Sequence, residues 1–193
     1  MNKKGYTFLE VLAVITVIGL TLPTLFTIVY SILRQQSKIN ALMKTRNEGD
    51  YALALIENLI KNSSVGVYST SDVSDPTKQR CNNPVTSPRY PVSGGTEDGS
   101  NIYFKDKFSH WFQLYSNSGI ISSDSSILNA SSDLTTSKVV ISNFKIYCET
   151  ASTFSTPLIS ISFQVRYNTT SLRPEEVATF NYQTKIKIRN ISN

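Results

Sequence analysis

The sequence predicts an α+β protein in which one long N-terminal helix packs on a mainly antiparallel β-sheet. An uncharged apolar run fills residues 11–33, a helical spacing of apolar residues continues to about residue 61, and two segments near the C-terminus alternate apolar and polar residues. These periods are typical of helix and half-buried strand. The 193 residues suffice for one membrane segment and one modest globular domain.

The apolar run is long enough to cross a membrane. From Val11 to Leu33 there are 23 consecutive residues without a formal charge, and as a helix they would be about 34 Å long, against a hydrocarbon core of roughly 30 Å. Glu10 directly precedes this run. Because an unpaired carboxylate there costs on the order of 2.5 kcal/mol or more, we expect a cation close to it.

Residues 3–10 read Lys-Lys-Gly-Tyr-Thr-Phe-Leu-Glu. With the apolar run that follows, they resemble the class III signal of type IV prepilins and type II secretion pseudopilins. In that family a prepilin peptidase cuts after the glycine and methylates the new first residue, which implies cleavage after Gly5 and N-methylation of Tyr6. The resemblance also implies that Glu10 pairs with the freed amino group of Tyr6 on a neighbouring subunit, which offsets both buried charges as a filament grows.

Two other interpretations explain the apolar run less well. A removable secretory signal has a shorter core, of about 7 to 15 residues, and a small-residue cleavage site. An ordinary single-span anchor explains the hydrophobicity, but it does not explain the segment Gly-Tyr-Thr-Phe-Leu-Glu directly after two lysines. The resemblance divides the chain into a leader peptide (1–5), a transmembrane and polymerisation helix (6–33) and a pilin-like globular domain (34–193).

The predicted helix continues beyond the apolar run, and two of its residues weaken it. Pro23 weakens the helix by about 3 kcal/mol unless its neighbours compensate, and Gly49 is a second weak position. A plausible end lies at residues 61–64. An apolar stripe is expected to lie on the sheet as part of the core: Ile39, Leu42, Met43, Leu53, Ile56, Leu59 and Ile60.

Residues 69–100 have a different composition, because 22 of these 32 are Ser, Thr, Asp, Asn, Gly or Pro. No regular element is expected there. A loop of this length is either disordered or functional. In pilin-like proteins the corresponding segment is often a subunit-contacting surface, so the resemblance implies a partner-facing region.

Strands are expected after this loop. A hairpin pair is predicted at residues 102–104 and 108–115, followed by a Ser-rich connection and a strand at 139–147. Residues 159–167 and 178–188 alternate apolar and polar side chains, which predicts one buried face on each strand.

The two cysteines, Cys81 and Cys148, fall in the part expected outside the cytoplasm, where disulfides persist. A bridge between them would connect the long loop to a strand and stabilise the fold by roughly 4 kcal/mol. The position of Cys148 at the end of its predicted strand is equally consistent with a buried free thiol.

Catalysis has little support in the sequence, so no enzyme, metal or cofactor is expected. His110 is the single histidine, and the loop acids Asp72, Asp75, Glu97 and Asp98 do not have the spacing of a calcium loop.

The charge of the chain is mildly positive. Without Lys3 and Lys4 the net charge falls from +5 to +3, since 17 basic and 14 acidic residues are left. Its basic residues are dispersed, so charge patterning gives no support to nucleic-acid binding.

The expected function is therefore that of a structural subunit of a type IV pilus or a type II secretion pseudopilus. The segment at 178–190 is similar to the ends of minor pilins and J-type minor pseudopilins, which favours a minor, initiating or tip-proximal subunit; a major pilin and a DNA-uptake or adhesive subunit are the alternatives. A DNA or adhesive ligand would contact the loop or the edge with Lys185, Lys187 and Arg189.

The resemblance also implies the partners and the location. The partners are prepilin peptidase, other pilin or pseudopilin subunits, the inner-membrane assembly machinery and, before assembly, membrane lipid. Lys3 and Lys4 before the span favour a cytoplasmic N-terminus and an exported C-terminal domain, whereas Arg34 and Lys38 oppose this weakly. The expected location is the bacterial cytoplasmic membrane and then a periplasmic or surface filament.

Overall fold

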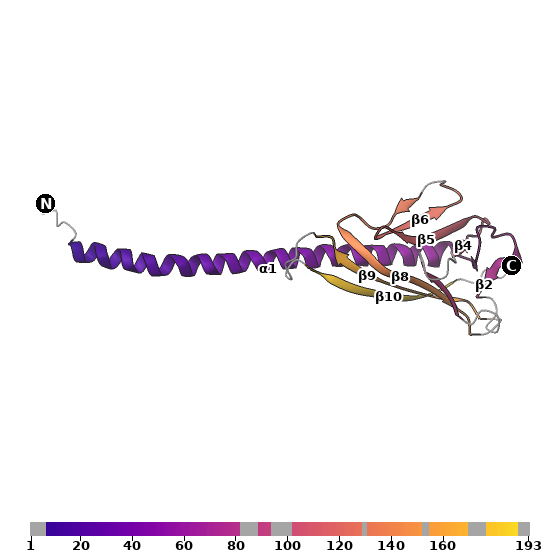
Figure 1. The fold of residues 1–193 in the computed structure, drawn as a ribbon. Helices are drawn as coiled ribbons and strands as arrows, with labels where there is room; N and C mark the ends of the chain where they lie inside the picture. Colours follow the sequence, from indigo (N-terminus) through magenta and orange to yellow (C-terminus); the bar gives the residue numbers. More distant parts are fainter. Residues whose placement is uncertain are drawn as a thin grey trace.

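A computed structural model of the chain describes residues 7–81, 89–93, 102–128, 131–151, 155–169 and 177–188. One 56-residue helix, α1 (Phe8–Ser63), precedes a β-rich domain (Figure 1). The elements after it are β1 (Gly66–Tyr68), the 3₁₀ helix η1 (Pro76–Lys78), β2 (Gln79–Arg80), β3 (Arg89–Ser93), β4 (Tyr103–Lys105), β5 (Trp111–Asn117), β6 (Ile120–Ser125), β7 (Ser132–Asp133), β8 (Val139–Glu149), β9 (Leu158–Tyr167) and β10 (Thr179–Lys187).

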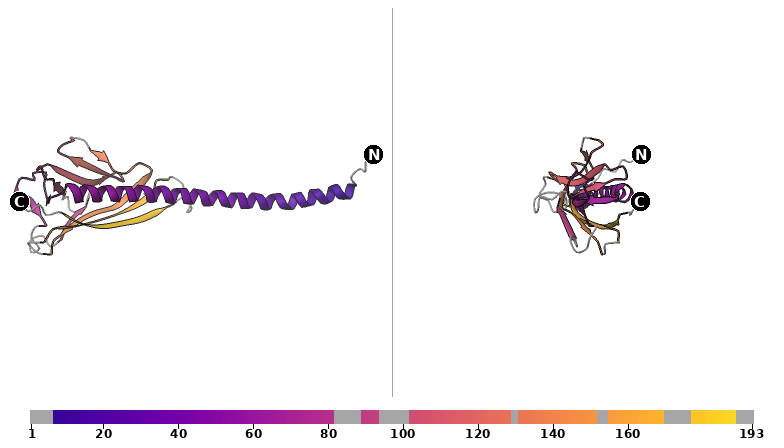
Figure 2. Two further views of the ribbon diagram at one scale, coloured as in Figure 1. Left: turned by 180° about the vertical axis from the view of Figure 1, so that it is seen from behind. Right: turned by 90° about the vertical axis from the view of Figure 1, so that its right-hand side faces the viewer.

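The molecule is elongated because the β-rich domain surrounds only the second half of α1. The first half of the helix projects away from the domain and carries the N-terminus at its far end (Figure 2). Its apolar side chains are therefore exposed, from Phe8 to Leu33. This confirms the expected α+β arrangement of a long apolar N-terminal helix and antiparallel strands.

The strands of the described residues form two sheets, whereas the sequence predicted one. A six-stranded sheet has the order β2-β1-β4-β5-β6-β7, and a four-stranded sheet has the order β10-β9-β8-β3. All of their pairings are antiparallel. The second half of α1 lies against β9 and β10, so the four-stranded sheet positions the helix.

The two strands with the clearest alternation pair along their whole predicted length. In β10, Phe180 and Tyr182 lie opposite Val165 and Phe163 of β9. The buried face of β9 consists of Ile159, Ile161, Phe163 and Val165, and the exposed side chains of β10 alternate with less exposed ones as predicted. The four apolar residues of β9 join Ile56 and Ile60 of α1 in the hydrophobic core.

The buried stripe of the helix differs from the predicted one. It consists largely of small residues at helical spacing: Ala41, Thr45, Gly49, Ala52, Ile56 and Ile60. Leu53 and Leu59 are partly buried, but Ile39 and Met43 are 53% and 54% exposed. Their assignment to the core was wrong. The side of the helix that packs against the domain carries small side chains instead, and these let the sheet approach the helix closely.

A short hairpin joins β5 to β6 within the stretch that was expected to be an irregular Ser-rich connection. Its two turn residues, Ser118 and Gly119, have φ values of 51° and 79°, which are typical of a type I′ turn. The Gly119 carbonyl accepts a hydrogen bond of 2.8 Å from the backbone N–H of Ile141. Since Ile141 lies in β8, this bond links the two sheets.

The expectation that residues 69–100 hold no regular element was also wrong. Within the described part, β1 pairs with β2 and η1 precedes β2. Strand β3 pairs with β8 at the edge of the four-stranded sheet. Pro91 is tolerated in β3 because one side of an edge strand needs no donor for the sheet. Residues 82–88 and 94–101 lie outside the described part.

Candidate assembly site

The candidate site is the helix that the sequence assigned to processing and assembly, and its described part begins at Thr7. Thr7 is the N-cap residue of α1, and Glu10 completes a capping box with it. The Glu10 carboxylate accepts hydrogen bonds from the Thr7 N–H at 3.1 Å and from the Thr7 hydroxyl at 3.3 Å. In return the Glu10 N–H donates to Thr7 Oγ1 at 3.4 Å.

This arrangement gives the Glu10 carboxylate partners within its own subunit. The first backbone N–H groups of a helix have no acceptor in the helix, and a side-chain oxygen at the N-cap satisfies one of them. A Thr-x-x-Glu spacing before an apolar run is the signature of this motif, so the role of Thr7 was readable from the sequence and was missed. Gly5 and Tyr6, the predicted processing residues, lie outside the described residues.

The apolar segment continues as helix through Pro23. Helix α1 is unbroken from Phe8 to Ser63 with Pro23 inside it, and it curves gently in this half (Figure 1). The Thr27 hydroxyl donates to the Pro23 carbonyl at 2.9 Å, and the Thr24 hydroxyl donates to the Thr21 carbonyl at 2.7 Å. Threonine side chains thus add hydrogen bonds around the position where proline removes one.

This half of α1 is long and apolar enough to span a membrane, and none of its most apolar window is buried within the chain. The end of the uncharged run is marked by a contact between an aromatic ring and a cation. Arg34 Nη2 donates to the Tyr30 hydroxyl at 2.7 Å, and the guanidinium carbon lies 4.4 Å from the centre of the Tyr30 ring. Such amphipathic side chains are enriched at membrane interfaces.

Beyond the apolar run, α1 keeps three large apolar side chains exposed. Ile39, Met43 and Tyr51 are 53%, 54% and 62% exposed. Residues 39 and 43 are four positions apart and lie on neighbouring turns of one side of the helix, whereas residue 51 lies two turns further and about 80° around the helix from residue 43. The second half of α1 therefore exposes apolar side chains to solvent and also buries apolar side chains against its own domain.

The helix is fixed to the domain by Tyr182 of β10. Its hydroxyl donates to the Arg46 carbonyl at 3.1 Å, and its ring stacks on Phe163 with 5.2 Å between the ring centres. Burial and then the negative charge of Asp50 raise the pKa of Tyr182 to about 12. Two residues further along β10, on the same face of the strand, the Thr184 hydroxyl donates a hydrogen bond to the Glu57 carboxylate. These contacts hold the orientation of α1 relative to the sheet.

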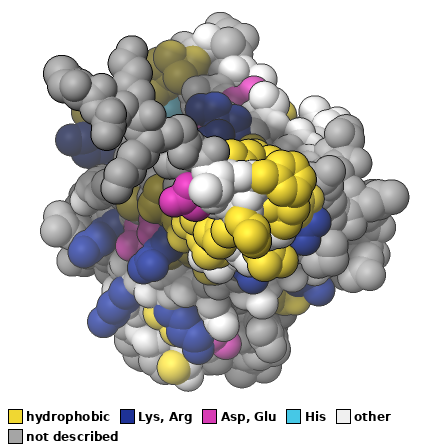
Figure 3. Space-filling view, turned by 90° about the vertical axis from the view of Figure 1, so that its left-hand side faces the viewer, with side chains coloured by type: hydrophobic (Ala, Val, Ile, Leu, Met, Phe, Trp, Pro, Cys, Tyr) yellow, Lys and Arg dark blue, Asp and Glu magenta, His cyan; other side chains and the backbone are white. Residues whose placement is uncertain are grey.

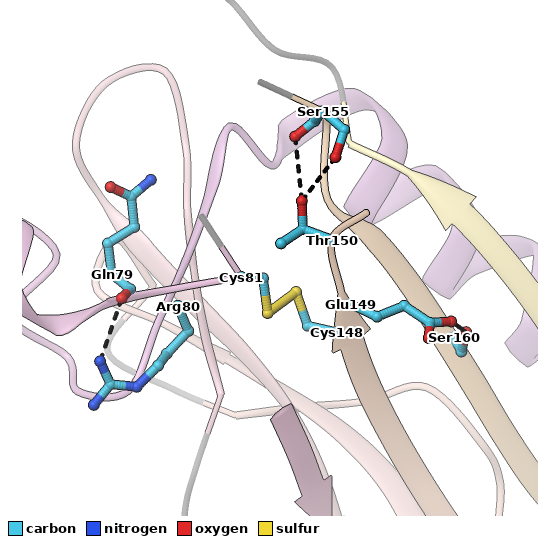
Figure 4. Close-up of a disulfide and its surroundings, with 8 residues drawn as sticks. All are labelled: Gln79, Arg80, Cys81, Cys148, Glu149, Thr150, Ser155 and Ser160. Carbon is cyan, nitrogen blue, oxygen red and sulfur yellow. Dashed lines mark hydrogen bonds between the residues drawn. A yellow bond between two sulfur atoms is a disulfide. The ribbon is translucent and has the colours of Figure 1, made fainter. Parts of the chain in front are cut away.

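A disulfide joins the segment after β2 to strand β8 (Figure 4). Cys81, which follows β2, is bonded to Cys148 of β8, with 6.0 Å between their Cα atoms. Both residues are fully buried. Since β2 belongs to the six-stranded sheet and β8 to the four-stranded one, the bond connects the two sheets.

The acidic and histidine candidates for catalysis are used in local turns where the structure describes them. Asp72 accepts from the Ser74 N–H, and Asp75 accepts from the Thr77 N–H and hydroxyl. The Thr77 hydroxyl bond is the main cause that lowers the pKa of Asp75. His110 Nδ1 lies 3.3 Å from Asp106 Oδ2 in an exposed turn.

Within the described ranges, no group of three or more His, Cys, Asp or Glu side chains is arranged to hold a metal ion. Glu97, Asp98 and Arg189 lie outside those ranges. Lys185 and Lys187 are exposed on β10, and Lys185 Nζ is 4.0 Å from Glu149 Oε1. Asp72 and Asp75, the two candidate acids within the described part, are therefore held in local turns and not in a metal centre.

Comparisons of the chain with protein-family models, with curated proteins and with solved structures found no match.

Proposed function

We propose that the chain is a structural subunit of a type IV pilus or a type II secretion pseudopilus. Prepilin peptidase cleaves it between Gly5 and Tyr6 and methylates Tyr6. The subunit is held in the cytoplasmic membrane by residues 6–33, with the β-rich domain on the outer side, and is then extracted into a filament. Its role is that of a minor, initiating or tip-proximal subunit.

The observation that carries this proposal is the junction at the start of α1. Residues 3–10 carry Lys3, Lys4 and Glu10, and the helix that begins at Phe8 has an apolar half without a partner among the described residues of its own chain. A membrane accommodates that half before assembly, and the equivalent helices of neighbouring subunits would accommodate it in a filament. One helix thus serves as anchor and as polymerisation element.

A second observation supports assembly in particular. An ordinary anchor needs no exposed apolar side chains beyond the membrane, whereas α1 keeps Ile39, Met43 and Tyr51 exposed on its exported half. Packing of these side chains against a neighbouring subunit would remove them from water, at roughly 25 cal/mol per Å² of apolar surface.

Mass spectrometry of the N-terminal peptide from native cells tests the proposal, with sheared surface material compared with washed membranes. An N-methylated peptide that starts at Tyr6 in the sheared fraction is expected for a pilus subunit. The same peptide only in membranes indicates a pseudopilus or a rare initiating subunit. An intact Met1 terminus in both fractions contradicts the proposal and favours a plain anchor.

A further inference from the structure

Strand β10 forms one border of the four-stranded sheet. The order β10-β9-β8-β3 gives β10 a neighbouring strand on one side only among the described residues. It pairs with β9 through consecutive residue pairs without a register shift, from Thr179 to Lys187. Its Tyr182 and Thr184 side chains reach α1 from one face of the sheet, and Figure 1 shows it along the border of that sheet. The outer side of β10 is therefore a regular strand edge.

The register identifies the backbone groups that face outward on this edge. The Tyr167 N–H donates to the Ala178 carbonyl at 2.9 Å, and the Ile188 N–H donates to the Pro157 carbonyl at 3.1 Å. Because hydrogen-bonded and non-hydrogen-bonded pairs alternate in an antiparallel ladder, the even-numbered residues of β10 bond to β9. The N–H and C=O groups of the odd-numbered residues point away from β9: Thr179, Asn181, Gln183, Lys185 and Lys187.

Most of the features that prevent the addition of a strand are missing from this edge. Natural edge strands are protected by proline, by bulges or by charged side chains. Residues 179–187 contain no proline, and their pairing with β9 has no bulge. Side-chain hydrogen bonds keep the sheet regular up to the edge, because Ser142 Oγ donates to Gln164 Oε1 at 3.1 Å and Gln164 Nε2 donates to Asn181 Oδ1 at 3.0 Å. The protection that β10 does have is its lysines.

These lysines determine which charge an added strand needs. Lys185 and Lys187 are exposed and two residues apart, so they lie on the same face of β10. Lys185 Nζ is 4.0 Å from Glu149 Oε1, whereas Lys187 forms no ion pair with a described residue. Residues 177–188 contain no acid. Since directly opposite side chains of an antiparallel pair interact, acids at alternate positions of an added strand would meet both lysines.

A second copy of β10 does not fit this edge. Two identical edges that pair across a two-fold axis perpendicular to the strands run antiparallel. Tyr182 contacts Arg46, and Thr184 contacts Glu57 further along the helix, so β10 and α1 run in the same direction. The two α1 helices of such a pair would point in opposite directions, which is incompatible with insertion of both apolar halves from the same side of one membrane.

Nucleic acid is another anionic partner to consider. Viewed along α1 from its N-terminal end, Lys and Arg side chains lie on several sides of the helix and are not gathered into one patch (Figure 3). Binding to a phosphate backbone uses clustered cations. An added peptide strand uses a row of backbone donors and acceptors, which is what β10 presents, so the edge favours a peptide.

We propose that the free edge of β10 binds an extended segment of another protein. The segment adds to the sheet as an antiparallel strand and places acidic side chains at alternate positions opposite Lys185 and Lys187. The surface belongs to the β-rich domain and not to the apolar half of α1. The proposal therefore goes beyond the structural role given above and does not depend on cleavage at Gly5 or on filament assembly.

Amide hydrogen exchange followed by NMR tests the proposal on the full chain in detergent micelles. The probe is the peptide Glu-Val-Glu-Val-Thr-Val-Thr, blocked at both ends, whose acids would lie opposite Lys187 and Lys185. Without peptide, we expect fast exchange at Asn181 and Gln183 and slow exchange at Tyr182, which bonds to β9. Excess peptide should slow Asn181 and Gln183 about tenfold or more and leave Tyr182 unchanged.

Two results of this experiment overturn the proposal. The first is equal exchange at Asn181 and Gln183 with and without the peptide. The second is slow exchange at these two residues in the free protein, because the edge would then be covered by the chain itself.

A proline on the edge tests the strand pairing. Gln183→Pro removes an outward N–H and no bond to β9, so the peptide should no longer slow exchange at Asn181. Gln183→Ala is the matched control, since it keeps the N–H and should keep the response. Slow exchange at Tyr182 shows that β10 is still paired with β9 in the proline variant. A full response in that variant overturns the assignment to this edge.

Charge reversal tests the acidic character of the partner and does not depend on the proline variant. Lys185→Glu/Lys187→Glu should lose the response to the acidic peptide and respond to one with lysines in place of its glutamates. Lys78→Glu/Lys107→Glu, at exposed positions outside β10, is the matched control for net charge. An unchanged response of the first double variant to the acidic peptide overturns the proposed charge pairing.

A thymidine oligonucleotide of similar length tests the nucleic-acid alternative. It should leave exchange at Asn181 and Gln183 unchanged, because phosphate contacts with lysine side chains do not use these N–H groups. Protection equal to that given by the peptide overturns the peptide assignment. Mass spectrometry of the N-terminus tests the pilus function separately, so the failure of one proposal is distinguishable from the failure of the other.

Discussion

The Tyr182 ring of β10 lies directly on the backbone of Gly49 in α1. A Cβ atom built on Gly49 would overlap the ring carbons and the hydroxyl of Tyr182, closer than real Cβ atoms approach other atoms. Glycine in the middle of a helix costs up to about 1 kcal/mol relative to alanine. At this position the missing side chain is what allows the ring to stack on Phe163 and to bond the Arg46 carbonyl.

Gly49→Ala should therefore destabilise the domain although it improves helix propensity. We expect the free energy of unfolding to fall by about 1 to 3 kcal/mol, because the ring must shift. In a Tyr182→Ala background the same substitution should raise it by up to about 1 kcal/mol, since only the propensity term is left. Denaturant unfolding of the four proteins in detergent micelles measures both effects, and an unchanged sign in the two backgrounds contradicts the proposed contact.

Tyr182 also predicts a pH dependence at the alkaline end. Its folded pKa, about 12, is above the ordinary value of 10.0. The neutral phenol is thus favoured by folding, and this contribution is complete below pH 10 and is lost as the pH rises through 12. The wild type should lose more stability than Tyr182→Phe over this range. Parallel losses in the two proteins would show that lysines or other tyrosines cause the alkaline effect.

Removal of the disulfide should weaken the connection between the sheets. Cys81 and Cys148 are 67 residues apart in the sequence, and the loop-closure estimate gives a loss of about 4 kcal/mol for a loop of this length. The Cys81→Ser/Cys148→Ser variant should unfold at lower denaturant concentration than the oxidised wild type. Reduced wild type is the matched control and should behave like the variant; equal stability of the oxidised and reduced proteins contradicts the prediction.

Glu10 has two separable roles, a cap within the subunit and the proposed charge partner between subunits. Glu10→Ala removes both, whereas Glu10→Gln keeps an acceptor for the capping box and removes only the charge. We expect both variants to be cleaved after Gly5 and both to be incorporated poorly into filaments. Immunoblots of sheared and membrane fractions measure this. Normal incorporation of Glu10→Gln would show that the charge is dispensable and that capping suffices.

Local chemistry explains why several elements were predictable. The capping residues, the end of α1 near residue 63 and the alternation in β9 and β10 depend on neighbours three or four positions away in a helix and two in a strand. The apolar segment is recognisable for the same reason, because its length and composition need no partner. The capping role of Thr7 was predictable for the same reason, because the Thr-x-x-Glu spacing is local in the sequence.

Other elements depend on which segments meet. Strands β6 and β7 lie in a Ser-rich stretch with weak alternation, and they form because the Ser118–Gly119 turn brings β6 back onto β5. Strand β3 lies in a Pro-containing loop and forms only because β8 offers an edge. Hydrogen bonds to a distant partner outweigh local propensity in such cases.

By itself the sequence determined a membrane-length helix, its polar entrance at Thr7 and Glu10, and the inward faces of the last two strands, since each follows from side chains close together in the chain. Only the tertiary structure decided that Ala41, Thr45 and Gly49 lie against the domain while Ile39 and Met43 face solvent. Several faces of this helix are apolar enough to be buried. The choice among them depends on the shape of the partner surface, and Tyr182 fits only where the helix has no side chain.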